Sequence, residues 1–490
     1  MKKLMLTIAT VTVIAAALVN VVTRNESDDS PKISLRADRT NSDYYQDRKA
    51  SLEKSLRHAK AGSGHAFKLQ SKLDRLENWR EGDPRMGHPE EFARILHEMR
   101  IPSDRTVPEY EPGYLYREIA QARRSLGPQD MSASSLVWQS RGPGNVAGRA
   151  RDIVVDPDDP TGDTWFIASV GGGVWHTANA GATWTQLMDD QPLLAMQSLA
   201  MAPSSTNILY TGTGESYFNI DTMNGNGLLR STDGGASWSP VASTVDDPRF
   251  NNVSRILISP TDPNVVLVST TVGRYKSGTT PSTHIFRTTD GAVNWTEVFM
   301  ATNGGGSSGA RVQQLIADPT DFNIQYATVH ETGILKSTDA GVTWNYINSG
   351  ITDFSGRYEM AISPVNSDYL YVSAEGASSS VLWVSWNGGA SWSAMSNTGG
   401  TDTWLGAQGW YDNAIVCHPT DATIVFVGGP QLYQLTINAV GGGFYSSTAL
   451  ASYSFPHPDH HILKIVEPSG GGWYLLGTND GGVTRTSSGV

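Results

Sequence analysis

One eight-residue pattern, Ser/Thr-x-Asp/Asn-x-Gly-x-x-Trp, decides how this chain folds. Its clearest copy reads Ser337-Thr-Asp339-Ala-Gly341-Val-Thr-Trp344. The five copies, which we call the turn boxes, start 48 to 57 residues apart and cover 177–184, 231–238, 288–295, 337–344 and 385–392. Self-similarity at a period near 50 residues is typical of repeat folds, propellers among them.

Each feature of the turn box has a mechanical explanation. The Asp or Asn side chain can accept hydrogen bonds from backbone amides of its own turn. The Gly supplies a backbone position with positive φ, although the third copy carries Ala292 there. The Trp can then pack between neighbouring sheets. We therefore interpret the box Asp and Asn residues as staples of a hairpin and not as catalysts.

A second marker is a short apolar run that ends in Pro. These runs alternate with the boxes and recur at about the same period along the chain. The runs end at Pro157, Pro203, Pro260, Pro319, Pro364, Pro419 and Pro468. Each unit reads as four short strands, with the box between the third and the fourth. Four strands at this period make one blade, so residues 136–490 are predicted to form an all-β, seven-bladed β-propeller.

The two ends of the predicted ring are unusual. The seventh unit breaks off within its box, at 486–490, whereas Val137–Ser140 around Trp138 reads like the strand that follows a box. A ring needs its last blade completed to remove free edges. We expect Val137–Ser140 to supply the outer strand of blade seven; the alternative is a truncated blade that continues beyond residue 490.

The N-terminal 135 residues have a different character. Lys2 and Lys3 precede an uncharged, mostly apolar run from Leu4 to Val22. This layout predicts residues 1–23 to be an export signal, or an uncleaved membrane anchor. Residues 24–135 read as a polar linker and a helical region, with helices expected at 42–60, 65–79, 89–99 and 118–126. The propeller is then expected outside the cytoplasm, as a secreted, periplasmic or cell-surface protein.

Composition narrows the functional classes. Only 17% of the 490 residues are charged and 50 are Gly, which favours short strands and tight turns. The single cysteine, Cys417, excludes a disulfide framework and a multi-cysteine metal site. The net charge is −12 overall, with +3 before residue 136 and −15 from there on, which argues against nucleic acid as a partner of the predicted propeller. No Gly-rich loop has a strand–loop–helix setting, so no nucleotide cofactor is expected.

The boxes resemble those of Asp-box (BNR) propellers, which occur in sialidases, xyloglucanase-like glycosidases and sortilin-type receptors. Over about 136–490 the chain is most similar to exported bacterial proteins with a sortilin-type, glycosyl-hydrolase-like propeller. Shared motifs include Ala168–Trp175, Thr211–Glu215, Gly409–Asp412 and Gly477–Gly482. The resemblance implies a propeller and leaves activity open, because such families include enzymes and receptors. The Arg-Ile-Pro segment of sialidases is absent, which argues against that activity.

Propeller topology places unusual polar residues on the face opposite the boxes, around the channel mouth. Loops on a rigid scaffold around a concavity are where ligands usually bind. Glycoside hydrolysis needs two carboxyl groups that flank the scissile bond. The catalytic candidates are Glu215, Asp412 and Asp480, and the ligand-binding candidates are Arg357, Tyr411, Asp459 and His460. His457, Asp459 and His461 alternate along an extended segment and could supply three metal ligands, but the sequence names no fourth.

Two functions follow from these residues, and the first is preferred because the sequence singles out no carboxylate pair. In the first, the protein is a binding module that holds a peptide or a glycan at the channel mouth. In the second, it is a glycoside hydrolase that uses a carboxylate pair on the same face. A pair about 5 to 10 Å apart across the mouth would distinguish the hydrolase from the binding module. The acidic balance favours a cationic, metal-bridged or polyhydroxyl ligand over an anionic one.

Overall fold

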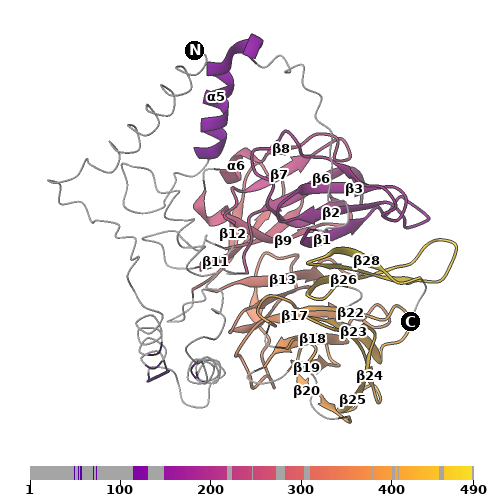
Figure 1. The fold of residues 1–490 in the computed structure, drawn as a ribbon. Coiled ribbons are helices and arrows are strands. Elements are labelled where there is room, and N and C mark those ends of the chain that lie inside the picture. The colour runs from indigo at the N-terminus through magenta and orange to yellow at the C-terminus, as the bar shows by residue number, and fades with distance from the viewer. Residues whose placement is uncertain are drawn as a thin grey trace, which may run out of the picture. The chain divides into compact units, whose positions relative to one another are not determined.

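The computed structural model describes residues 114–130, 148–217, 223–245, 247–271, 282–302, 310–376, 380–399, 403–406, 408–451 and 457–487, with single positions between 49 and 73. From residue 150 onwards these residues form seven β-sheets, the blades of a propeller (Figure 1). This confirms the predicted all-β, seven-bladed architecture.

Five blades consist of four strands in chain order. Blade one holds β1 (Ala150–Val155), β2 (Trp165–Ser169), β3 (Gly173–Thr177) and β4 (Thr185–Gln186). Blade two holds β5 (Met196–Ala202), β6 (Ser205–Thr213), β7 (Leu228–Ser231) and β8 (Ser239–Pro240). Blade three holds β9 (Asn252–Ile258), β10 (Val266–Thr271), β11 (Ser282–Thr288) and β12 (Thr296–Thr302). Blade four holds β13 (Val312–Ala317), β14 (Gln325–Val329), β15 (Gly333–Ser337) and β16 (Asn345–Tyr346). Blade five holds β17 (Tyr358–Ile362), β18 (Leu370–Glu375), β19 (Ser380–Ser385) and β20 (Ser393–Ala394).

The last two blades depart from this plan. Blade six holds β22 (Ala414–Cys417), β23 (Ile424–Gly428), β24 (Leu432–Ile437) and β25 (Phe444–Ala449). A two-residue strand from the segment after blade five, β21 (Ser396–Asn397), pairs in parallel with β25. Blade seven has three strands among the described residues: β26 (His460–Val466), β27 (Tyr474–Asn479) and β28 (Gly482–Arg485).

The seven apolar runs ending in Pro fall on the first strands of the blades, β1, β5, β9, β13, β17, β22 and β26. These strands line the central channel. The second strands are buried on both faces, for example throughout β10 and β14. Each blade lies between two others, so both faces of its middle strands meet apolar side chains, which suits uninterrupted β-branched and aromatic runs.

The turn boxes are hairpin staples, as predicted. In the fourth box, Asp339 Oδ1 accepts the backbone N–H groups of Val342 at 3.1 Å and Thr343 at 2.9 Å. Ser337 Oγ accepts the N–H of Gly341 at 2.9 Å, and Gly341 has φ +79°. Ala292 adopts φ +74° at the same position of the third box, so the turn imposes its conformation even without glycine.

The box tryptophans pack between adjacent blades. Trp238 of blade two lies in an apolar cluster with Phe166 of blade one and Leu209 of its own blade. Trp392 of blade five packs with Tyr326 of blade four and donates from Nε1 to the backbone oxygen of Ile347 at 2.8 Å. The boxes therefore hold blades together as well as shaping hairpins.

Blade seven meets blade one and so closes the ring. Figure 1 shows yellow β26 and β28 beside β1 and β2, where Ile153 and Trp165 share a core with Tyr474 and Leu476. Arg485 also pairs with Asp163 across this contact, at 2.9 Å. The predicted outer strand of blade seven, Val137–Ser140, lies outside the described residues and stays a prediction.

Helices are few in the described part of the chain: α5 (Tyr114–Asp130), the short α6 (Ala242–Val245) and the 3₁₀ turn η1 (Pro248–Phe250). Helix α5 covers and extends the segment predicted at 118–126. Apart from single positions, the other predicted helices lie outside the described residues, as does the predicted export signal. No helix among the described residues is long and apolar enough to span a membrane.

Candidate active site at the channel mouth

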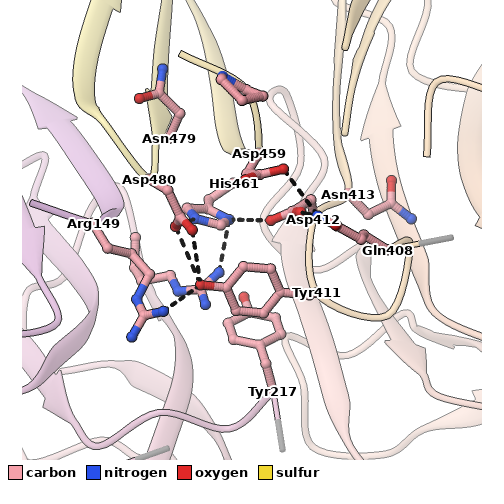
Figure 2. Close-up of polar contacts among 12 residues, drawn as sticks. Arg149, Tyr217, Gln408, Tyr411, Asp412, Asn413, Asp459, His461, Asn479 and Asp480 are labelled. Atoms are coloured by element: carbon pink, nitrogen blue, oxygen red, sulfur yellow. Dashed lines mark hydrogen bonds and ion pairs between the residues drawn. The ribbon is translucent and has the colours of Figure 1, made fainter. Parts of the chain in front are cut away.

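All seven blades send polar residues to the end of the channel opposite the turn boxes, which we call the mouth face. They stand at the start of the first strands or in the links between second and third strands. The set, which we call the mouth cluster, comprises Arg149, Arg151, Glu215, Tyr217, Arg255, Arg311, Arg357, Glu359, Gln408, Tyr411, Asp412, Asp459, His461 and Asp480. Figure 2 shows the side chains on the blade-six and blade-seven side of this cluster.

Arg151 is the buried cation at the centre of the cluster. Its Nη2 and Nε donate to Glu215 Oε1 at 2.6 and 3.1 Å, and its Nη1 donates to His461 Nδ1 at 2.7 Å. The guanidinium lies between the rings of Tyr217 and Tyr411, 4.4 and 4.2 Å from their centroids. Burial is the largest influence on the pKa of Arg151 and lowers it, but Glu215, Tyr411 and Tyr217 together outweigh burial and the pKa is raised. Arg151 therefore stays charged in the interior.

Tyr217 lies across the end of the channel. Its ring also faces Arg357, at 4.6 Å, and its hydroxyl accepts from Arg255 at 3.4 Å. Its backbone oxygen accepts from Arg311 at 2.9 Å. Burial raises the pKa of Tyr217, yet the surrounding arginines outweigh burial and lower it. Arg255, Arg311 and Arg357 come from different blades, so Tyr217 lies near the axis and closes the channel at this face.

Arg357 organises the floor of the cluster. It donates to Glu359 Oε1 at 3.1 and 2.5 Å and to the backbone oxygens of Tyr411 and Asn413 at 2.6 and 3.1 Å. Its side chain is fully buried. These hydrogen bonds lie within the protein and beneath the surface, so Arg357 supports the site from below, and its contact with a ligand stays a prediction.

His461 lies between two carboxyl groups, the partly exposed Asp480 and the buried Asp412. Since Arg151 can only donate, His461 Nδ1 accepts, and we assign the ring proton to Nε2, which donates to Asp480 Oδ1 at 2.7 Å. Burial and Arg151 lower the pKa of His461 well below its ordinary value. Asp412 Oδ1 lies 3.3 Å from the same Nδ1.

The surroundings of Asp412 favour its neutral form. Burial, with Asp459 nearby, raises its pKa well above the ordinary value. Its Oδ1 accepts no hydrogen bond from the described residues. Arg151 already occupies the lone pair of His461 Nδ1, so Asp412 Oδ1 lies beside that nitrogen without a donor of its own. A carboxylate at this place would lack stabilising hydrogen bonds on Oδ1.

Gln408 extends the network toward solvent. Its Nε2 donates to Asp412 Oδ2 at 2.8 Å and to Asp459 Oδ1 at 3.0 Å (Figure 2). Asp459 has φ +70°, a left-handed conformation that Asp tolerates better than most residues. Tyr411 supplies another branch, because its hydroxyl lies 2.5 Å from Arg149 Nη1 and 3.2 Å from Asp480 Oδ1. The order Asp480, His461, Asp412, Gln408, Asp459 is thus one continuous chain of contacts.

The predicted site residues divide by accessibility. Asp480 keeps 26% of its side chain exposed and Arg149 keeps 20%, and Asp459 is partly exposed. Glu215 and Asp412, by contrast, have no exposed side chain. Arginines and aromatic rings of the mouth cluster thus surround Glu215 and Asp412, whereas Asp459 and Asp480 stay accessible to solvent.

The remaining predicted ligands are not brought together. His460 is buried away from the network, its Nδ1 has no hydrogen-bond partner among the described residues, and burial lowers its pKa to about 4. His457 is exposed and its Nδ1 faces the backbone oxygen of Pro458 at 2.9 Å. Within the described residues no three His, Cys, Asp or Glu side chains could hold a metal ion. The proposed site of His457, Asp459 and His461 fails because His461 is engaged by Arg151 and Asp480.

Sequence reasoning missed Tyr217, Gln408 and Trp410. Trp410 is partly exposed beside Tyr411, with ring centroids 5.3 Å apart and planes at 49°. Trp410 lies inside the Gly409–Asp412 motif, which could have indicated it. Tyr217 and Gln408 carry no pattern of their own and acquire their roles only through contacts with distant segments.

No protein-family model matches the chain, but it is similar to known proteins in sequence and in fold. The xyloglucanase Xgh74A of Acetivibrio thermocellus is 28% identical over 177 residues, which cover 32% of this chain and 21% of the relative. A xyloglucanase of a Paenibacillus species is 30% identical over 129 residues, covering 25% of this chain and 12% of the relative. The matched region is thus about a fifth or less of the length of these relatives.

The structural comparison agrees on the fold. The crystal structure of an ancestral GH74 enzyme superposes with a TM-score of 0.56 at 19% identity, covering 72% of this chain and 46% of that chain. At this identity the likeness shows the propeller fold alone. The chain is therefore a seven-bladed β-propeller with neighbours among GH74 xyloglucanases.

Proposed function

We propose that this protein is a glycoside hydrolase that acts on a polysaccharide at the mouth face, with Asp480 and Asp459 as the carboxyl groups that contact substrate. The single observation that carries the proposal is the chain of contacts from partly exposed Asp480 through His461 to buried Asp412, whose pKa burial raises. Acid–base catalysis needs carboxyl groups whose surroundings set different proton states.

The sequence candidates for catalysis were Glu215, Asp412 and Asp480. Burial removes Glu215 and Asp412 from contact with a polymer, because neither exposes its side chain. The acids that reach solvent are Asp480 and Asp459, held in place from behind by His461 and Gln408. Asp412, His461 and Gln408 are then positioning residues, and Asp412 keeps a second negative charge away from Asp480.

Hydrolysis would divide between the two accessible acids. One carboxylate takes a proton from the attacking water while the water oxygen bonds to the anomeric carbon. The other carboxyl group gives a proton to the glycosidic oxygen as the bond between that oxygen and the anomeric carbon breaks. Asp480 suits the first role, since it accepts hydrogen bonds from His461 Nε2 and the Tyr411 hydroxyl. Asp459 suits the second, on the other side of the buried Asp412.

A carbohydrate fits the surroundings better than a peptide does. Trp410 offers a partly exposed ring beside the acids, and an aromatic face with polar neighbours suits the apolar face of a sugar. Both sequence relatives are xyloglucanases, which supports the hydrolase better than a pure binding module. The turn-box hydrogen bonds also fit the resemblance to Asp-box propellers.

Location outside the cytoplasm belongs to the same proposal. It rests on Lys2, Lys3 and the apolar run Leu4–Val22, which lie outside the described residues. A polysaccharide substrate fits that location. Cell fractionation with an antibody to the propeller tests it, and recovery of the full-length chain in the cytoplasm would contradict it.

The test of activity uses the purified full chain with xyloglucan, carboxymethylcellulose and laminarin, and measures the release of reducing ends. Asp480→Asn and Asp459→Asn are each expected to lower kcat by about 10²–10⁴-fold. Asp339→Asn, in a turn box on the opposite face, is the matched control and should retain the wild-type rate. Turnover that survives in the double variant Asp412→Asn, Asp480→Asn would place the site elsewhere.

One observation favours a second candidate, a glycan-binding module without turnover. The ring of His461 stands between Asp412 and Asp480, so these two acids do not flank open space. Affinity electrophoresis in gels containing the same polysaccharides separates the candidates. Retarded migration that Asp480→Asn abolishes, without release of reducing ends, would support the binding module and contradict the hydrolase.

A further inference from the structure

The propeller holds a cavity of about 500 Å³ along its axis, beyond the mouth cluster. Its inner end is formed by buried Arg255, Glu359 and His461, the underside of that cluster. Its outer end reaches the exposed Pro319 and Pro364, which follow first strands on the face of the turn boxes. The cavity is therefore closed toward the candidate active site and opens on the box face.

The cavity wall combines polar groups with an apolar surface that the first strands supply. Five aliphatic side chains of these strands are only partly buried although they lie inside the ring: Ile256, Ile316, Ile362, Val416 and Ile462. Their exposed surface faces the cavity. A concave space of this volume, with an apolar wall and a few polar groups, is in the range that small-molecule ligands occupy.

The acids near the inner end already have partners. Asp152 accepts the backbone N–H groups of Ile153 at 2.8 Å and Leu199 at 2.9 Å. Glu359 accepts from Arg357 at 3.1 Å and pairs with Arg255 at 3.3 Å. These carboxylates consequently do not need a cationic ligand.

Lys464 of β26 differs from them. It lines the cavity, and among the described residues its ammonium group makes no hydrogen bond and no ion pair within 4.0 Å. Burial lowers the pKa of Lys464, with Asp152 opposing this effect and Arg255 adding to it. The Lys464 side chain is partly buried within the cavity, where less water surrounds its charge, so an anion beside it would stabilise that charge.

We propose that the cavity binds a small organic carboxylate with an apolar body, whose carboxylate pairs with Lys464 and whose body lies against the isoleucines of the wall. The ligand enters from the box face, because the mouth cluster closes the other end. Exposed Glu467 lies at the opening, where its negative charge disfavours an anion. The site is separate from the mouth cluster and does not depend on the proposed hydrolase.

The probe is hexanoate, titrated calorimetrically into the full chain near neutral pH, with hexan-1-ol and hexylammonium as matched probes. Hexanoate is expected to bind at least tenfold more tightly than either. Lys464→Met should weaken hexanoate binding tenfold or more, and Glu467→Gln should strengthen it. Lys336→Met is the control, since Lys336 bonds to the backbone oxygen of Gly388 away from the cavity.

A second measurement uses the wild-type protein, in case Lys464→Met does not fold. Limited acetylation followed by mass spectrometry should show that hexanoate slows modification of Lys464 several-fold and leaves Lys336 unchanged. Equal binding of hexanoate and hexan-1-ol, or no protection of Lys464, would overturn the proposal. Asp480→Asn should bind hexanoate normally, so failure of the hydrolase and failure of this site are distinguishable.

Discussion

The box face and the mouth face are built from the same blades in opposite ways. Each turn box closes within eight residues, as when Asp339 binds the N–H of Thr343 four positions later. At the mouth, Arg149 meets Tyr411 across 262 positions and Arg151 meets His461 across 310. The box face is built from short-range contacts that recur in several blades, whereas the contacts of the mouth face form only when the ring has closed.

The same contrast appears in the acids. On the box face, hydrogen bonds from the turn lower the pKa of Asp233 and Asp339 to about 2. At the mouth, burial raises the pKa of Asp412 well above its ordinary value. Exposed donors favour the carboxylate and a desolvated site favours the acid, so the two faces shift the pKa of the same residue type in opposite directions.

The largest expected effect tests whether the mouth is a cooperative unit. Arg151→Met removes the buried cation beside His461 and leaves Glu215 only its longer ion pair with Arg149, at 3.4 Å. It should lower the free energy of unfolding by about 3–5 kcal/mol. Urea unfolding measures this. The double variant Arg151→Met, Glu215→Met should recover part of the loss, because neither charge is then stranded.

The control for that prediction is Arg287→Met, which removes a bond to the backbone oxygen of Ala340 near the boxes. It should lower stability by less than about 1 kcal/mol. If Arg287→Met and Arg151→Met had equal effects, the mouth would not be the more strongly coupled region.

The second prediction asks how strictly a turn box depends on its backbone. A Cβ on Gly341 would lie 2.2 Å from Leu267 Cδ2, at φ +79°. Gly341→Ala should therefore lower the free energy of unfolding by about 2–4 kcal/mol, combining a left-handed alanine with overpacking. Ala292→Gly is the converse control and should shift the thermal midpoint little. Unchanged stability of Gly341→Ala would show that the box can relax.

A third prediction concerns pH between about 4 and 6.5. Since the pKa of Asp412 is raised in the folded state, its contribution to stability is lost as pH rises through that pKa. Since the pKa of His461 is lowered, its contribution is lost as pH falls below the ordinary value. In the wild type the two effects on the free energy of unfolding therefore change in opposite directions as pH changes.

Asp412→Asn removes the contribution of Asp412 to the pH dependence of the free energy of unfolding. Its free energy of unfolding should rise more steeply with pH than that of the wild type, by up to about 1.4 kcal/mol per pH unit. Urea titrations at half-unit steps measure the difference. Parallel curves would mean that Asp412 is a carboxylate in the folded protein.

The smallest effect is expected for one box acid. Asp339→Ala removes the acceptor of two backbone N–H groups and should cost about 1 kcal/mol, as the loss of a helix cap does. Ligand affinity and turnover at the mouth should not change. A stable Asp339→Ala variant without mouth activity would show that the faces are coupled.

The sequence predicts the local contacts of the turn boxes well and the long-range contacts of the mouth face less well. Box positions such as Asp339 and Gly341 act locally, so their spacing was enough to predict the blades. Topology also placed Asp412, Asp459 and Asp480 in the same region. Burial of Glu215, Arg357 and His460 depends on packing against Tyr217 and other distant groups, which no local pattern encodes. The two-residue strand β21 was missed because pairing so short has no sequence period.

The distance along the chain between Arg151 and His461 also has a consequence in time. At roughly 5–20 residues per second, a ribosome needs some tens of seconds to pass from the first to the second. During that interval a nascent chain can form early turn boxes, but it has no partner for the arginines of blade one from blades six and seven. The mouth cluster is therefore the last part of the protein to be completed, and a chain interrupted before residue 461 carries finished blades without a site.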